Sequence, residues 1–561
     1  MRNALRAAIG AALLALPAAA EADTLVDNVQ GETVTSDGRV ESFTAMRFSD
    51  DGTILAVYHK GDKLPRAQYR VDGKGRVLLP GLIDAHLHLL QLGFAALTLD
   101  LSETKSLAEA QTRIRDYAAA HPDRPWIIGR GWNQEVWGLG RFPTAAELDA
   151  AVADRPVWLE RVDGHAGWGN SAALKAAGVT AATKDPAGGQ IVRGPGGAPA
   201  GVLVDNATGL VGRIVPAPRA EDRDLALATA QDLLFKRGIT AAADMGTDIE
   251  DWQALRRAGD LNRLYLRVMV YAAGTEAMAL IGGSGPTPWL YSDRLRMGGV
   301  KLYMDGALGS RGAWLKAPYA DAPGIGLPRL SDTQLGNLMS RAAIDHFQVA
   351  VHAIGDRANG AVLDAVEQLN LTYKGDRRWR IEHAQVLDPA DIARFAKLGV
   401  IASMQPVHQT SDRQMAEARL GPARLAGAYA WHSLLASGAR MAFGSDAPVE
   451  LPDPFAGMAA AISREGPDSQ PAGGWQPQER VTRAEALAGY TSGAAYAGFA
   501  EQKFGRIAPG LRADFIFVDT DPMQASPAQI RATKVFEVWI GGGKVYSVDP
   551  PVASTKRIKE R

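Results

Sequence analysis

The chain has 561 residues, of which 46% are hydrophobic and 22% charged, and this composition is typical of a folded protein with a sizeable core. Its 61 basic and 62 acidic residues give a formal net charge of -1, which offers no basic surplus for binding a nucleic acid. The chain has no cysteine, so disulfides and thiolate metal sites are excluded, and histidine, carboxylate or a modified lysine would have to bind any metal.

The first 22 residues have the three parts of a secretory signal peptide. Two arginines, Arg2 and Arg6, precede an apolar stretch over 7–16, and Ala20-Glu21-Ala22 supplies the small residues of a cleavage site. Cleavage there would leave Asp23 as the first residue of a periplasmic or secreted protein. The alternative is a short N-terminal anchor, but the apolar run is shorter than the ~20 residues of a membrane span, and no later segment supplies one.

Short alternating stretches at both ends of the mature chain predict a small β-sandwich. These strand-like segments are 39–43, 53–58, 514–518 and 534–540. Neither group is large enough to be stable alone, so we expect the two ends to fold together. The predicted sandwich comprises 23–78 and 503–550, with a catalytic domain over 79–502 inserted between them.

The body of the chain alternates short apolar stretches with helical ones, the pattern of βα repeats around a parallel sheet. Eight candidate strands are found, at 79–88, 238–245, 264–271, 299–305, 348–354, 379–385, 399–405 and 441–447. Eight is the number of strands in a TIM barrel, and ionisable residues follow their carboxyl ends, where barrel active sites are built. The predicted fold class is therefore α/β, a (β/α)8 TIM barrel.

The first two candidate strands are separated by far more residues than a βα connection needs. Helices are predicted at 105–119 and 222–237, and a segment rich in Trp and Gly lies between them. We interpret 105–237 as an inserted subdomain that covers the barrel and shapes a substrate pocket. An insertion remote from the chemistry is the alternative.

Histidines and one aspartate at the strand ends indicate a metal site. His86 and His88 lie two residues apart at the end of the first candidate strand, so both imidazoles project from one face and form half of a zinc site. His352 and His383 end later strands; a single histidine there is more often a packing residue, but four at three strand ends favour metal binding. Asp446 ends the eighth strand, where a carboxylate can bind a metal and act as general base.

Lys301 lies between apolar residues within the fourth candidate strand, where an unpaired charge would be costly. Reaction of its neutral amine with carbon dioxide would give a carbamate, an anion whose two oxygens can bridge two cations. The alternative is a lysine paired with Asp305 or Glu382.

Six motifs carry a family resemblance: 80–88 (PGLIDAHLH), 163–165 (DGH), 301–306 (KLYMDG), 352–359 (HAIGDRAN), 382–384 (EHA) and 444–446 (GSD). Together they resemble the amidohydrolase superfamily, and in particular amidohydrolase family 3, the branch that includes N-substituted formamide deformylase. The segment 505–515 is similar to the superfamily's return into its β-sandwich. The resemblance covers nearly the whole mature chain.

The resemblance implies a metal site formed by His86, His88, Lys301, His352, His383 and Asp446. In it, the histidines of the first strand and the aspartate bind one metal ion, the later histidines bind a second or orient the substrate, and the lysine is a carboxylated bridge. The implied cofactor is one or two divalent ions, with zinc the first candidate. The resemblance is also consistent with a homodimer, which no sequence feature shows.

The expected reaction is hydrolysis of the C–N bond of a small amide or formamide. A metal lowers the pKa of water toward neutrality, the resulting hydroxide attacks the carbonyl carbon, and Asp446 passes the proton to the leaving nitrogen. Trp132, Asn133, His165 and Arg357 are candidates for substrate contact, with packing or loop fixing as the alternative for each. Two other functions stay open: hydrolysis of an ester, lactone or phosphoester, and a non-catalytic periplasmic binding module.

Overall fold

The computed structural model describes residues 22–36 and 38–548. All of the predicted signal peptide except Ala22 lies outside these residues. Among the helices of the described ranges, none combines the length and the apolar character that crossing a membrane requires.

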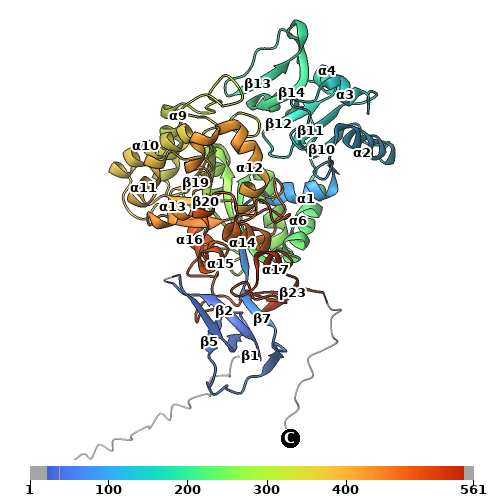
Figure 1. The fold of residues 1–561 in the computed structure, drawn as a ribbon. Helices are drawn as coiled ribbons and strands as arrows, with labels where there is room; N and C mark the ends of the chain where they lie inside the picture. Colours follow the sequence, from blue (N-terminus) through green and yellow to red (C-terminus); the bar gives the residue numbers. More distant parts are fainter. Residues whose placement is uncertain (1–21, 37, 549–561) are drawn as a thin grey trace, which may run out of the picture.

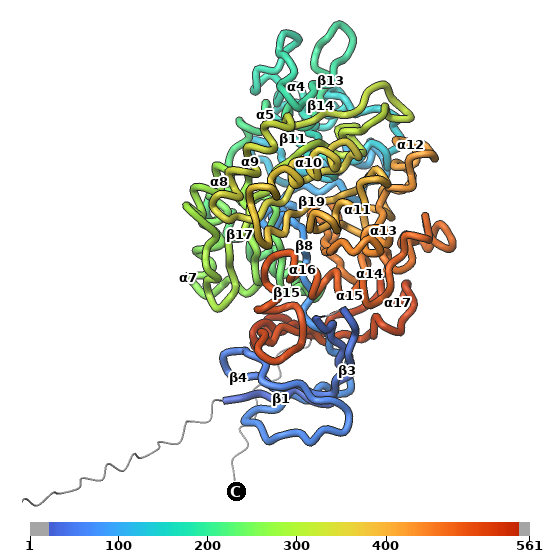
Figure 2. The backbone as a smooth tube through the Cα atoms, turned by 90° about the vertical axis from the view of Figure 1, so that its left-hand side faces the viewer, coloured from blue at the N-terminus to red at the C-terminus, as the bar shows by residue number. Residues whose placement is uncertain are grey.

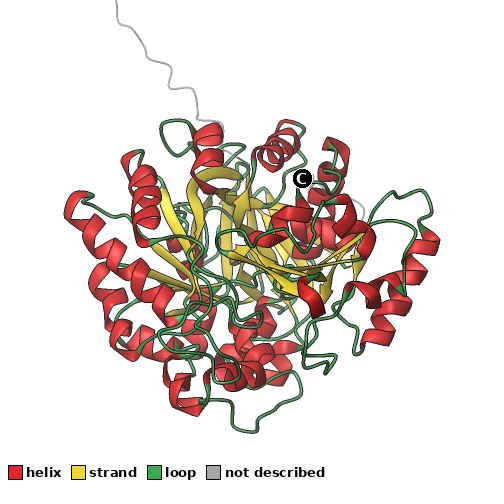
Figure 3. Cartoon of the chain, turned by 90° about the horizontal axis from the view of Figure 1, so that it is seen from above, coloured by secondary structure: helices red, strands yellow, loops and turns green. Residues whose placement is uncertain are grey.

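Eight parallel strands form a nearly closed barrel at the centre of the molecule. They are β8 (Leu82–Leu87), β15 (Ile239–Thr247), β16 (Arg267–Ala273), β17 (Leu295–Tyr303), β18 (Gln348–Ala353), β19 (Arg380–His383), β20 (Ile401–Met404) and β21 (Arg440–Phe443). They follow one another around the sheet in chain order, and nearly all of their residues are buried, as in strands covered on both faces. Seen from above, the strands lie within a ring of helices (Figure 3). The predicted α/β barrel is confirmed.

The helices around the barrel follow the strands along the chain. The longer ones are α1 (Leu89–Leu97), α6 (Ala220–Phe235), α7 (Ile249–Asp260), α8 (Gly274–Gly282), α9 (Asp332–Ile344), α10 (Asp356–Thr372), α11 (Pro389–Leu398), α12 (Pro406–Leu420) and α14 (Pro454–Ser463). The shorter ones are α13 (Trp431–Ala436), α15 (Arg483–Gly489), α16 (Ser492–Ala497) and α17 (Pro527–Arg531). The helix predicted at 222–237 corresponds to α6.

Two backbone hydrogen bonds close the barrel between its first and last strands. The Asp446 N–H donates to the His86 carbonyl at 2.7 Å, and the His88 N–H donates to the Ala447 carbonyl at 2.7 Å. Both bonds lie at the carboxyl ends of β8 and β21. The closure of the barrel and the candidate metal ligands therefore occupy the same place.

The single strand predicted at 79–88 is divided in two by Gly81. Its first part is β7 (Val77–Pro80), which pairs with strands of the chain termini, and its second part is β8 of the barrel. A Cβ atom at Gly81 would lie 2.2 Å from Oγ1 of Thr240, so only glycine permits this close crossing. The break lets one segment begin in one sheet and end in another.

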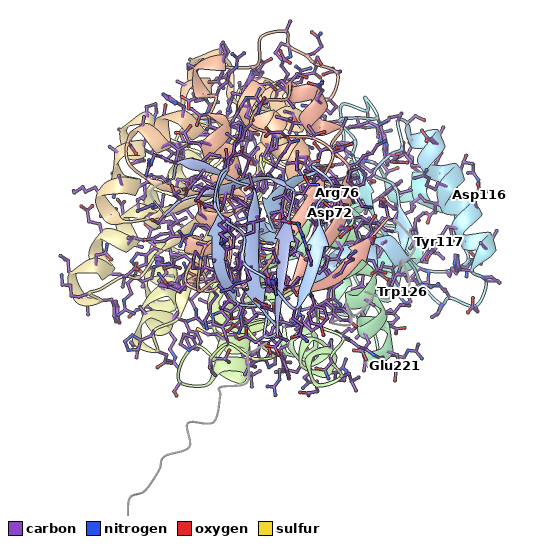
Figure 4. The ribbon with its side chains drawn as sticks, turned by 90° about the horizontal axis from the view of Figure 1, so that it is seen from below. Asp72, Arg76, Asp116, Tyr117, Trp126 and Glu221 are labelled. Atoms are coloured by element: carbon purple, nitrogen blue, oxygen red, sulfur yellow. The ribbon has the colours of Figure 1, made fainter. Side chains whose placement is uncertain are left out.

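Strands from both ends of the chain form two further sheets beneath the barrel (Figure 1). The first contains β2 (Gln30–Val34), β3 (Val40–Phe43), β7, β22 (Phe515–Val518), β23 (Val535–Ile540) and β24 (Gly543–Ser547). The second contains β1 (Asp23–Asp27), β4 (Ala45–Ser49), β5 (Ile54–Tyr58) and β6 (Tyr69–Asp72). Antiparallel pairing of β22 with β7 joins the C-terminal strands to the N-terminal ones. From below, these strands, among which Asp72 of β6 is labelled, lie in front of the barrel (Figure 4).

The insertion between the first two barrel strands forms a sheet of its own. Its strands are β9 (Leu99–Asp100), β10 (Ile127–Trp132), β11 (Val157–Arg161), β12 (Ala166–Gly169), β13 (Gly189–Arg193) and β14 (Pro199–Asp205). Its helices are α2 (Leu107–Ala120), the helix predicted at 105–119, with α3 (Ala145–Asp149), α4 (Ser171–Ala176) and α5 (Gly209–Gly212). The insert and the terminal sheets lie at opposite ends of the molecule (Figures 1 and 2). Because β8 runs away from the terminal sheets, its carboxyl end faces the insert.

Candidate metal centre

Two histidines of the first barrel strand and one aspartate beyond the last form a compact group. Nε2 of His86 and Nε2 of His88 each lie 3.3 Å from Oδ1 of Asp446. One ligand atom from each of the three lies within 4.8 Å of the others, and His86 and Asp446 are buried. Two imidazoles and a carboxylate at such spacing are typical ligands of a divalent metal.

A second group shares the same aspartate. It joins Asp446 to His383 at the end of β19 and to His408 in the first turn of α12, again with ligand atoms within 4.8 Å. Nε2 of His408 is buried, has no hydrogen-bond partner among the described residues, and lies 3.8 Å from Oδ2 of Asp446. A buried ring nitrogen without a partner is costly, and a bound cation would satisfy it. The residues present therefore fit one metal ion or two.

His408 was not predicted from the sequence. It lies beyond the carboxyl end of β20, and Pro406 opens the helix that carries it. The apolar strand pattern ends before this residue, so no strand-end signal marks it. A search for histidines in the first helical turn after each candidate strand would have found it.

A buried ion pair fixes the orientation of His86. Its Nδ1 lies 2.6 Å from Oε2 of Glu382, and because a carboxylate only accepts hydrogen bonds, Nδ1 is the donor and Nε2 is left to face Asp446. Arg380 holds Glu382 with two hydrogen bonds of 2.8 and 3.1 Å. Burial alone would raise the pKa of Glu382, but the Arg380 guanidinium and His86 outweigh it and hold that pKa well below its ordinary value.

Asp84 ties the ends of β8 and β21 together. Its Oδ1 accepts hydrogen bonds from the Ser445 N–H at 2.9 Å and the His86 N–H at 3.1 Å, and its Oδ2 accepts one from the Ser445 hydroxyl at 2.5 Å. Burial raises the pKa of Asp84 to about 7, although the hydrogen bonds from Ser445 oppose the shift. The residues on either side of the barrel closure are thus held by one carboxyl group.

Three residues of the centre adopt left-handed backbone conformations that are strained for side chains other than glycine. His383 has φ 75°, Ala384 has φ 43° and Asp446 has φ 60°. Strained backbone that the surrounding structure maintains is common at functional sites, where it aims particular side chains. Here it turns two candidate ligands away from the regular path of their strands.

Lys301 lies on β17 with Nζ 3.2 Å from Nε2 of His86. Burial lowers the pKa of its ammonium group to about 8. Neither alternative partner forms an ion pair with it among the described residues, since Asp305 accepts hydrogen bonds from backbone N–H groups and Glu382 is bound by Arg380. Lys301 is therefore a buried amine beside a candidate ligand.

His352 lies next to the two ligand groups without being part of either. Its ring centroid is 4.7 Å from that of His383, but its Nε2 lies 3.4 Å from the Gly306 carbonyl oxygen and 3.5 Å from Oδ1 of Asp305. Burial is the main cause that holds its pKa well below the ordinary value, so the imidazole is neutral and able to bind a metal.

A cavity of about 470 Å³ opens onto the centre. His383, His408 and Asp446 form part of its wall, and the insert, the loop after β17 and α12 supply most of the rest. The size suits a small organic molecule. The insert therefore borders the space beside the candidate ligands, and Asn133 and His165 are among the residues it contributes.

The other two candidates for substrate contact lie elsewhere. Trp132 is fully buried in the core of the insert, where its indole N–H donates to the Leu159 carbonyl at 2.8 Å. Arg357 is exposed at the start of α10 and stacks on Trp314, with its guanidinium carbon 4.4 Å from the ring centroid. Neither belongs to the cavity wall.

Comparison with known proteins identifies relatives across most of the chain. It is 34% identical over 554 residues to the protein LONG AFTER FAR-RED 3 of Arabidopsis thaliana, covering 94% of this chain and 92% of that one. It is 36% identical over 482 residues to the putative amidohydrolase YtcJ of Bacillus subtilis, covering 84% and 89%. It is 27% identical over 509 residues to N-substituted formamide deformylase of Arthrobacter pascens, covering 86% and 90%.

A solved structure has the same overall fold. An uncharacterised metal-dependent hydrolase of Pyrococcus horikoshii superposes with a TM-score of 0.72 at 26% sequence identity, covering 90% of this chain and 99% of that one. The family described as "Amidohydrolase family" matches residues 70–546, which include both ligand groups and the cavity. The chain therefore belongs to amidohydrolase family 3, and it is a metal-dependent hydrolase of the amidohydrolase superfamily with a His-His-Asp metal site.

Proposed function

We propose that this hydrolase cleaves the C–N bond of a small amide or formamide. The observation that carries the proposal is the position of Asp446, which belongs to both ligand groups and also borders the cavity. Similarity to a protein named N-substituted formamide deformylase supports this bond type over an ester, lactone or phosphoester. A non-catalytic binding protein has no need of two ligand groups around one carboxylate.

Each residue of the centre has a defined task in this reaction. A bound divalent metal supplies Lewis acidity, which polarises a carbonyl and lowers the pKa of water. Asp446 accepts a proton from the attacking water, and the leaving nitrogen needs a proton as the C–N bond breaks. His86 is held in one tautomer by Glu382, so its Nε2 stays directed at the centre. The cavity walls hold the substrate carbonyl next to Asp446.

We further propose two zinc ions bridged by a carboxylated Lys301. Neutral imidazole and carboxylate are ligands that suit zinc. The Lys301 amine is buried, lies beside His86 and has no carboxylate partner among the described residues, which favours reaction with carbon dioxide over a buried charge. A carbamate would supply the anionic oxygens that a second cation requires.

Metal content by elemental analysis tests the centre. We expect two ions per chain in the wild type, loss of both in His86→Ala, and one ion in His408→Ala. Lys301→Ala should bind fewer than two, and reloading of the metal-free wild type should depend on bicarbonate. The control is His59→Ala, a histidine of the terminal sheets with a side chain 48% exposed, which should keep both ions.

The other possible metal contents each contradict a different part of the proposal. Two ions in Lys301→Ala would contradict the carbamate and leave the metal centre intact. One ion in the wild type, lost with His86, would indicate a mononuclear enzyme. No ion after reconstitution would overturn the proposed function. A panel of formamides, amides, ureas and esters then tests the bond type, and turnover of esters alone would contradict C–N hydrolysis.

We also propose that the protein is exported to the periplasm or secreted, because 1–22 has the composition of a signal peptide. N-terminal sequencing of the protein from its native host should begin at Asp23. A mature protein that begins at Met1 would contradict export by this route.

A further inference from the structure

A histidine and an aspartate of the insert form a buried pair at the cavity. Nδ1 of His165 lies 2.7 Å from Oδ1 of Asp205, and the side chains are 13% and 0% exposed. His165 precedes β12 and Asp205 ends the neighbouring strand β14, and the Asp205 N–H donates to the His165 carbonyl at 2.8 Å. Because the carboxylate accepts, Nδ1–H is the donor and Nε2 is the ring nitrogen that remains for other contacts.

The barrel provides a fitted place for the Asp205 carboxylate. A Cβ atom at Gly306 or at Gly312, in the loop after β17, would each lie 2.6 Å from Oδ2 of Asp205. Asp205 itself has φ 49°, a strained conformation for this residue type. His165 is its ion-pair partner among the described residues. The carboxylate is therefore bound by His165, and the two glycines leave the space that it occupies.

His165 also lies close to the metal centre. Its ring centroid is 5.0 Å from that of His352, which in turn is 4.7 Å from that of His383. The cavity wall contains His165, His383 and Asp446 together. No described residue forms a hydrogen bond with Nε2 of His165, so this atom is available to a molecule in the cavity.

We propose that His165, held by Asp205, is a catalytic residue that contacts the leaving nitrogen and gives it the proton it needs when the C–N bond breaks. The inference rests on the proposed function and adds a second proton-handling group, on the wall that the insert supplies. Asp205 is a positioning residue that acts through His165. The arrangement is the one by which an aspartate fixes the tautomer of a catalytic histidine in hydrolases of other folds.

The reaction balances with one water. Its oxygen forms the new C–O bond, one of its protons passes to Asp446, and the C–N bond breaks as the nitrogen takes a proton from Nε2 of His165. Asp446 then releases its proton through the cavity, and His165 regains one. An amine is a poor leaving group without a proton, whereas a nitrophenolate leaves readily as an anion.

This difference in leaving groups provides the test. The probes are 4-nitroformanilide and 4-nitrophenyl formate. They share the formyl group and the nitrophenyl ring, and they differ only in the group that links the two, which is NH in the anilide and O in the ester. For His165→Gln we expect kcat on the anilide to fall about 10²- to 10⁴-fold, and kcat on the ester to fall less than about 10-fold. Asp205→Asn should show the same preference with a smaller loss. Metal content should match the wild type in both variants.

The matched control is His121→Gln, a histidine of the insert whose Nδ1 bonds the Tyr117 carbonyl oxygen and which lies outside the cavity wall. It should leave the ratio of anilide to ester activity unchanged. Equal losses on both probes in His165→Gln and Asp205→Asn, with metal retained, would overturn this inference and leave the proposed function standing. A wild type that cleaves neither probe, nor any amide of the panel, would overturn the proposed function and this inference with it.

Discussion

Among single side chains, Glu382 orients the candidate ligand His86 without belonging to either ligand group. Its carboxylate accepts from Nδ1 of His86 on one side and from Arg380 on the other, and all three are buried. Arg380 also donates to the Ala85 carbonyl at 2.7 Å and to the Ser403 hydroxyl at 2.9 Å. Such a fully bonded charged cluster holds one geometry, so the position of His86 is set by residues behind it.

Replacing Glu382 with glutamine should weaken metal binding as well as destabilise the fold. Glutamine keeps the size of the side chain but leaves the buried Arg380 guanidinium without a counter-charge. We expect metal affinity to fall about 10- to 100-fold, as for other residues that orient metal-binding histidines. Competition with a chelator of known affinity measures it, with Glu41→Gln, at an exposed pair with His59, as the control. Unchanged affinity in Glu382→Gln would contradict the orienting role.

Between elements, α6 and α7 are joined by a titratable contact. Asp248 caps α7 by accepting from the Asp251 N–H at 2.7 Å, and Arg223 of α6 donates to Oδ1 of Asp251 at 3.0 Å. Burial, with the neighbouring Asp248 as a further cause, raises the pKa of Asp251 to about 7. This carboxyl therefore titrates near neutrality in the folded protein.

The contribution of Asp251 to the free energy of unfolding should fall as the pH rises. Because the folded-state pKa is raised above the ordinary 3.8, the folded protein binds more protons than the unfolded chain between about pH 4 and pH 7. The free energy of unfolding thus decreases through that window. Asp251→Asn removes the titration, so its stability relative to the wild type should improve by on the order of 2 kcal/mol from pH 4 to pH 8. Chemical denaturation at both pH values measures this, and a constant difference would contradict it.

For the whole molecule, one buried ion pair connects the barrel to the terminal sheets. Arg267 of β16 binds Asp514 through two hydrogen bonds of 2.5 and 2.8 Å, with side chains 1% and 2% exposed. The same carboxylate accepts from the Gly541 N–H at 2.7 Å. The pair lies at the end of the barrel opposite the metal centre, since Arg267 is the first residue of its strand.

Breaking this pair should destabilise the protein without changing its chemistry. Asp514→Ala leaves the Arg267 charge buried, and we expect a loss of about 3–5 kcal/mol in the free energy of unfolding. The control is Asp224→Ala at the exposed pair with Arg257, where the loss should stay below about 1 kcal/mol. Thermal unfolding measures both. An Asp514→Ala protein with the wild-type Tm would contradict the predicted loss of stability. Altered metal content in this variant would contradict the expectation that the pair has no part in catalysis.

The sequence predicted residues that follow a repeating pattern and missed those that depend on distant contacts. The barrel strands could be predicted because each is a short apolar run, and His86 and His88 because they end one. His408 lies in the first turn of a helix, outside that pattern. The pairing of His86 with Glu382 joins positions 296 residues apart, which periodicity cannot indicate. Trp132 follows a glycine at the end of β10, and its burial depends on the three-dimensional packing of the insert.

The hydrogen bonds that close the barrel also govern when the metal centre can form during synthesis. Asp84 and Ser445, which hold the two sides of the closure, are 361 residues apart in the chain. A growing chain that already contains His86 and His88 lacks their carboxylate partner until the last barrel strand has been made and has met the first. Capture of metal is therefore a late event in folding, and it marks the chains whose barrel is complete.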